Sequence, residues 1–118
     1  MEEVELRIDE YGTKRYFIKG TNIRHRENGP ATEGANGDKY WFQYDKRHRL
    51  DGPAIEYANG SKFWLQYGKY HRLDGPAIEW HDDKEEFWIN GIHIPNVNSI
   101  EEAMSCGGDL ILIKSLLE

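Results

Sequence analysis

A stretch of 23 residues recurs three times along the chain, and this internal repeat constrains the fold more than any other feature. The motif His-Arg-x-Asp/Asn-Gly-Pro-Ala begins at His25, at His48 and at His71. A repeat of this length is one supersecondary unit that stacks on its neighbours. The sequence therefore predicts a single domain with three repeats over residues 25–94, a degenerate N-terminal hairpin over 1–24 and a helical segment over 95–118.

Each repeat carries two turn signals separated by short segments rich in aromatic and β-branched residues. Asn36-Gly37 and Asn59-Gly60 favour hairpin turns because both residue types tolerate positive φ. The Gly-Pro element marks the second turn and the start of the next strand, where no ladder donor is needed. The pattern predicts a mainly β fold, a single-layer antiparallel meander of seven or eight strands built from stacked hairpins.

The turn length sets the expected register of each hairpin. If Asn59-Gly60 lies in a three-residue loop with a glycine bulge, Glu56 is opposite Lys62 and Ala54 is opposite Trp64. Opposite charges then face each other, and a large ring faces a small side chain. This register predicts that one face carries the set Ile55, Tyr57, Phe63, Leu65 and Tyr67, and that the other carries Trp41, Trp64 and Trp88.

The segment 95–118 differs from the repeats. Ser99 and Glu102 have the spacing of a capping box, which predicts a helix start there. Gly107-Gly108 is expected to end that helix, and Asp109 to begin a second one with Leu and Ile on one face. This segment is expected to pack on the sheet or on a partner.

Composition narrows the functional classes. The chain has 118 residues, a net charge of −6 and one cysteine, Cys106. The negative charge disfavours binding to double-stranded nucleic acid, and a lone cysteine excludes an intrachain disulfide. The acidic start lacks the apolar core of a signal peptide, and no apolar run approaches the roughly 20 residues that span a bilayer. We therefore expect a cytoplasmic protein without a membrane partner.

The order of residues in each unit resembles the MORN repeat. Here it reads Trp64, Gly68-Lys69, His71, Gly75 and Trp80 over one period. The chain is most similar to variant MORN-like repeats with an HR-x-DGPA core, found in bacterial and phage proteins. The resemblance covers residues 25–94 well and 11–24 weakly. It implies stacked hairpins in a curved sheet and roles in protein contact, self-association or lipid contact, and it implies no catalytic residues or cofactor.

The repeat places basic residues along the edge opposite the Asn-Gly turns. Arg26, Arg49 and Arg72 are candidate anion ligands there, together with His48 and His71. The alternative is structural, in which each arginine or histidine bonds a local aspartate or turn carbonyl. Three histidines do not predict a metal site, because equivalent residues two strands apart are separated by about 9.5 Å and zinc holds its ligand atoms at about 2 Å.

The aromatic residues form a second candidate surface. Trp41, Trp64, Tyr67 and Trp88 recur at the repeat spacing, and rings beside arginine suit stacking on a nucleotide base. They can equally form the core on one face. Because two short helices cover only about one face of such a sheet, the Trp64 face is the better candidate for contact.

These observations predict a non-catalytic binding module. Near-identical copies argue against one special acid–base pair, and Cys106 at a helix C-terminus is a poor nucleophile. We expect self-association, as a homodimer or higher oligomer, through the aromatic face or the C-terminal helices. The expected role is that of a phage or mobile-element accessory protein that sequesters a small anionic ligand such as a cyclic nucleotide signal. The alternative is a protein–protein adaptor or an inhibitor of a host protein.

Overall fold

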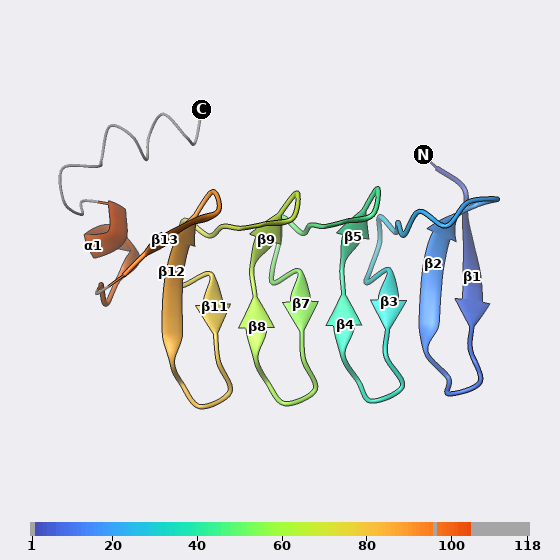
Figure 1. Cartoon of the computed structure of the whole chain (residues 1–118), viewed down its shortest axis with the longest axis horizontal. Helices are drawn as coiled ribbons and strands as arrows, with labels where there is room; N and C mark the ends of the chain where they lie inside the picture. Colours follow the sequence, from blue (N-terminus) through green and yellow to red (C-terminus); the bar gives the residue numbers. More distant parts are fainter. Residues whose placement is uncertain (1, 96, 105–118) are drawn as a thin grey trace.

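A computed structural model describes residues 2–95 and 97–104, and its regular secondary structure is almost entirely antiparallel β-strand (Figure 1). The main sheet of the described residues has nine strands in the order β1-β2-β3-β4-β7-β8-β11-β12-β13, so neighbours in sequence are mostly neighbours in space. The mainly β fold with antiparallel hairpins is confirmed. The principal extents of 50, 32 and 17 Å describe a long, thin molecule.

The strands are short except at the two ends of the sheet. Their bounds are β1 Val4–Ile8, β2 Lys14–Ile18, β3 Thr32–Glu33, β4 Lys39–Tyr40, β5 Phe42–Gln43, β6 Lys46–Arg47, β7 Ile55–Glu56, β8 Lys62–Phe63, β9 Leu65–Gln66, β10 Lys69–Tyr70, β11 Ile78–Glu79, β12 Glu85–Ile89 and β13 Ile92–Ile94. The single helix of the described residues, α1, covers Ile100–Met104.

The Asn-Gly turns form at one edge of the sheet and fix the register of each hairpin. Gly60 has a φ of 97°, a left-handed conformation that glycine adopts without steric cost. The three-residue loop with a glycine bulge places Glu56 opposite Lys62 and Ile55 opposite Phe63. The expected pairing of these residues is confirmed, and the first repeat has the same register.

The strand does not continue straight through the tryptophan of the repeat. The backbone N–H of Trp64 donates to Ala77 O of the next repeat at 2.7 Å, and Ala54 N donates to Phe63 O at 2.8 Å. The expected pairing of Ala54 with Trp64 is therefore not a ladder pair. Beyond the bend, the chain forms a separate small hairpin, β9 with β10, and β5 with β6 in the preceding repeat. These bends raise the number of described strands to 13, not the seven or eight predicted.

The core lies along the middle of the sheet and between the bent hairpins. One cluster is made of Ala54, Ile55, Phe63, Leu65 and Ile78, all of them buried, with Tyr40, Trp41, Tyr57, Tyr70 and Trp88 packed against it. Because the interior layer is aromatic as well as aliphatic, rings meet edge to face, as Tyr57 and Phe63 do at 5.3 Å. A polar chain can fold this way because each large ring buries much apolar area.

The C-terminal helix covers the last strands. Glu102 N donates to Ser99 Oγ at 3.1 Å, and the Glu102 carboxylate accepts from Asn98 N at 3.0 Å. Ser99 is therefore the N-cap, as predicted, although the carboxylate bonds one residue before it. Ile100 and Ala103 pack with Val97 on a second cluster of Phe87, Ile89 and Ile94. The predicted stop at Gly107-Gly108, the second helix from Asp109 and the thiol of Cys106 lie outside the described residues.

The third repeat has one extra residue before its tryptophan. The backbone hydrogen bonds nevertheless recur every 23 residues, so the tryptophan lies one position further along the repeat than in the first two units. Arg72 N donates to Trp88 O just as Arg49 N donates to Leu65 O, so Trp88 occupies the position of Leu65. The expectation that Trp88 lies with Trp41 and Trp64 on one face does not hold in this register.

Candidate binding edge

The loops that connect each repeat to the next lie at the edge opposite the hairpin turns (Figure 1). The histidine of each His-Arg motif accepts a hydrogen bond from a tight turn of this edge. The Nδ1 atom of His48 accepts a hydrogen bond from Tyr67 N at 3.0 Å, and that of His71 accepts from Asn90 N at 2.8 Å. Tyr67 and Asn90 both have a φ of 48°. The imidazole therefore stabilises a left-handed backbone that costs about 1–2 kcal/mol in a non-glycine residue.

This bond defines the protonation state of the rings. An Nδ1 atom that accepts from a backbone N–H carries no proton, so the ring is the neutral Nε2–H tautomer. Burial lowers the pKa of both His48 and His71, in keeping with neutral rings. The predicted partner, an aspartate or a turn carbonyl, is wrong for the histidines: a backbone N–H 19 residues later takes that place.

His25 makes the equivalent bond in the first repeat and is the most deeply buried of the three. Its Nδ1 accepts from Tyr44 N at 3.1 Å, and the residue is 0% exposed. Its Nε2 atom makes no hydrogen bond within the described residues, and Glu27 Oε1 lies 3.6 Å from it. The polar edge of this ring therefore faces the loop that carries Glu27.

Each repeated arginine places its guanidinium over an aromatic ring of the preceding hairpin. The guanidinium carbon is 4.0 Å from the Trp41 ring for Arg49 and 3.8 Å from the Trp64 ring for Arg72. A cation over a ring face at this distance is attracted by the ring quadrupole. The Trp64 face, expected to be free for contact, is thus covered in part by an arginine of the same chain.

Polar contacts hold the same guanidinium groups in place. Arg49 donates from Nε to Asp51 at 2.9 Å and from Nη1 to Pro53 O at 3.1 Å. Arg72 makes the matching bonds to Asp74 at 2.8 Å and Pro76 O at 3.0 Å. The arginines therefore bond the local aspartate and a loop carbonyl, which is the structural alternative stated above. The bonded arginine lowers the pKa of each aspartate.

The glycine of the motif makes room for the arginine. A Cβ atom on Gly52 would lie 2.8 Å from Arg49 Cζ, which is closer than van der Waals contact allows. The same distance holds for Gly75 and Arg72. The recurring spacing of Arg, Asp and Gly within the motif is thus explained by one local structure, in which the loop folds under its own arginine.

Two open grooves lie between consecutive loops of this edge. The first has a volume of about 730 Å³ and the second about 470 Å³. Both have a wall of arginine, tryptophan, glutamine, leucine and aspartate at matching positions of the repeat. The first is lined by Arg26, Glu27, Asn28, Gly29, Trp41, Gln43, His48, Arg49, Leu50 and Asp51, and the second by Arg49, Leu50, Asp51, Gly52, Trp64, Gln66, His71, Arg72, Leu73 and Asp74.

The grooves bring most of the predicted site residues together and leave two aside. Tyr67 is 65% exposed on its turn and stacks on His48 with ring centroids 4.0 Å apart. It was expected on the core face with Ile55, and the left-handed turn moves it outward. Trp88 packs against Tyr70 instead of lining a groove.

Two features of the site were not predicted from the sequence. Leu50 and Leu73, the variable residue of the motif, are 75% and 48% exposed at the rims of the grooves. Gln43 donates to Arg26 O at 2.9 Å and ties one hairpin to the preceding loop. A leucine in a loop carries no signal of its own, because exposure depends on how the loop folds.

The described residues hold neither a metal centre nor a membrane helix. Over 2–95 and 97–104, no three or more side chains of the ligating types are grouped to hold a metal ion. No helix in the same part of the chain is long and apolar enough to cross a membrane.

Comparison with known proteins adds no relative. No protein-family model matches the chain, and no match is found among the curated proteins or the solved structures.

Proposed function

We propose that the protein is a non-catalytic repeat module that binds an extended segment of another protein along the two grooves of the His-Arg edge. The observation that carries the proposal is the repetition of one groove at the spacing of the hairpins. Two grooves lined at matching positions of the repeat provide a row of similar contacts, whereas a catalytic site needs distinct environments. The MORN-like resemblance of the motif agrees with a role in protein contact.

The spacing of the grooves favours one backbone conformation for the partner. Equivalent positions of neighbouring hairpins are two strands apart, or about 9.5 Å. A polyproline II helix advances about 3.1 Å per residue with three residues per turn, so side chains three apart lie on one face at about 9.3 Å. An extended β-strand would instead turn every third side chain to the other face. A proline-rich segment therefore matches the grooves.

The chemistry of the walls agrees with a partner of low charge. Leu50 and Leu73 provide apolar surface beside Trp41 and Trp64, which is the kind of wall that proline-rich segments contact. Both arginines of the second groove are already paired with carboxylates: Arg72 with Asp74 and Glu79, and Arg49 with Asp51 and Glu56. A strongly anionic ligand would gain little from a charge that is already paired.

The test uses peptides and variants that leave the folded scaffold intact. A fluorescent proline-rich peptide with leucine at every third position should bind, and Leu50→Asp and Leu73→Asp should each weaken binding about tenfold, because one apolar contact is worth roughly 1–2 kcal/mol. Tyr11→Asp, at an exposed turn away from the grooves, is the control. Equal binding by all variants, or no binding of the peptide, would overturn the proposal.

One observation favours a small anion as a second candidate for the first groove. Asn28 stands where Arg49 and Arg72 have an aspartate, and Arg26 donates there to the carbonyl of Pro30 at 3.1 Å. A volume of about 730 Å³ is within the range of small-molecule sites. Calorimetric titration with cyclic dinucleotides and trinucleotides tests this. Heat that Arg26→Gln removes would support it, and the absence of heat would exclude it.

A further inference from the structure

The outermost strand at the N-terminal end of the sheet, β1, has an open edge. In the strand order β1 has a neighbour on one side only, β2 (Figure 1). Asp9 N donates to Thr13 O at 3.1 Å, and Lys19 N donates to Glu3 O at 2.9 Å. Hydrogen-bonded pairs alternate along an antiparallel ladder, so the odd-numbered residues of β1 are the ones bonded to β2.

The even-numbered residues therefore direct their backbone groups outward. The N–H and C=O groups of Val4, Leu6 and Ile8 point away from β2, and nothing in the described part of the chain pairs with them. Their side chains are also accessible, since Leu6 is 45% and Ile8 59% exposed. Natural proteins usually protect such an edge with charged side chains, especially lysine, or with proline or a bulge. Strand β1 has no lysine, proline or bulge, and its two charged residues, Glu5 and Arg7, are of opposite sign.

We infer that β1 pairs with β1 of a second copy of this chain, antiparallel and about a two-fold axis through Leu6, and joins the two sheets into one. In this register Leu6 faces Leu6, and Val4 of each copy faces Ile8 of the other. All are hydrogen-bonded pairs, because these residues carry the outward-facing groups. The interface is isologous and closed, as expected for a dimer. It places the apolar side chains of both strands together on one face.

Charge complementarity selects this occupant over an unrelated strand. The same register puts Glu5 of each copy opposite Arg7 of the other, in the closer, non-hydrogen-bonded pairs. The five residues of β1 read Val-Glu-Leu-Arg-Ile, so the strand is its own complement when reversed. A parallel pairing in register would place like charges side by side.

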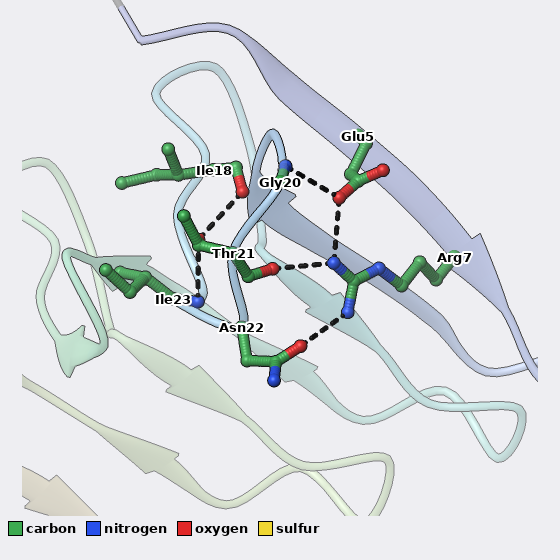
Figure 2. A network of polar contacts seen from close by, with 7 residues as sticks. All are labelled: Glu5, Arg7, Ile18, Gly20, Thr21, Asn22 and Ile23. Carbon is green, nitrogen blue, oxygen red and sulfur yellow. Dashed lines mark hydrogen bonds and ion pairs between the residues drawn. The ribbon is translucent and has the colours of Figure 1, made fainter.

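The chain already orders these two side chains in one network. Figure 2 shows Arg7 donating to Thr21 O at 2.6 Å and to Asn22 Oδ1 at 2.9 Å, while Glu5 accepts from Arg7 at 2.7 Å and from Gly20 N at 3.0 Å. Both bonds of Glu5 use Oε1, which leaves Oε2 for Arg7 of the second copy. The Arg7 guanidinium lies over the Phe17 ring of β2 at 4.1 Å, so pairing requires it to exchange an acceptor on the turn for this oxygen. The turn thus limits the side-chain entropy that is lost on pairing.

Charge reversal in two separate chains tests the inference. Sedimentation velocity of the full chain should show a dimer, and Glu5→Lys and Arg7→Glu should each weaken dimerisation at least tenfold. Both variants also lose the intrachain ion pair, so circular dichroism checks that each is folded. Mixed together they should form a heterodimer, because positions 5 and 7 of one variant then carry two positive charges that face two negative charges on the other. Only an intermolecular pairing can produce this rescue.

A crosslink places the two-fold axis. Paired residues on such an axis have Cα atoms about 5.5 Å apart, within disulfide range. In a Cys106→Ser background, Leu6→Cys should therefore form a disulfide dimer, and Tyr11→Cys should not. A monomeric native chain, dimeric single variants, or a mixture that stays monomeric would each overturn the inference. The peptide assay of the grooves is independent of all three results.

Discussion

Replacement of Arg49 by alanine should destabilise the fold, because this side chain covers Trp41 and closes its own loop. The cation–π contact at 4.0 Å contributes about 1 kcal/mol, and the charged hydrogen bond to Pro53 O about 1.5 kcal/mol. The ion pair with Asp51, whose side chain is 87% exposed, adds little. We expect a loss of about 2–3 kcal/mol in the free energy of unfolding.

Urea denaturation measures this loss. With a slope of about 1.5–2 kcal/mol per molar, the midpoint should fall by roughly 1–2 M at an unchanged slope. Leu50→Ala, the adjacent and largely exposed position, should stay within about 0.5 kcal/mol of the native chain. Arg49→Lys should recover part of the loss only, since lysine lacks the planar fork. Equal midpoints for Arg49→Ala and Leu50→Ala would refute the structural role of the arginine.

Three further perturbations concern the same loops and turns. Gly52→Ala should destabilise the native chain, because the added Cβ would displace the Arg49 guanidinium. The same substitution should cost little stability in the Arg49→Ala background, and a double-mutant cycle by urea denaturation checks this coupling. Because burial lowers the pKa of His48, the unfolded chain takes up a proton first, so the free energy of unfolding should fall as the pH drops below about 6.5. Urea midpoints from about pH 8 to pH 5 should show this fall, and His48→Gln should reduce its dependence on pH. Asp83→Gly should raise the free energy of unfolding by about 1 kcal/mol, since Asp83 has a φ of 70° at the turn where Gly60 has 97°; an unchanged urea midpoint would show that the turn is not strained.

The turns and the register were predictable because they depend on local chemistry. Asn59-Gly60 sets the loop length, and the loop length determines that Glu56 faces Lys62. The capping of the last helix by Ser99 is local in the same sense. Each of these features involves residues only a few positions apart.

The bend at the tryptophan was not predictable, because it depends on contacts between repeats. Trp64 bonds Ala77 of the next unit, and its ring is covered by Arg72. The histidine bonds across 19 residues to a backbone N–H, which has no sequence signal at all. Ser61 is a similar case: it is 1% exposed and accepts from His81 N, 20 residues away, at 3.0 Å.

The sequence predicted which residues lie at the candidate site better than it predicted the contacts that they make. The motif indicates that arginines such as Arg49 recur on one edge and tryptophans such as Trp41 on one face, but the contact between the two side chains appears only in three dimensions. That stacking turns the arginines from free anion ligands into part of the wall. The exposed leucines, which the motif leaves variable, are the residues that we propose a partner contacts.

Titration of the isotope-labelled protein with the proline-rich peptide, followed by amide chemical shifts, tests the central claim most directly. We predict that the shifts change together in residues 26–29, 48–52 and 71–74, because one extended segment would lie across both grooves. Changes confined to other parts of the sheet, or no changes at saturating peptide, would contradict the binding edge described above.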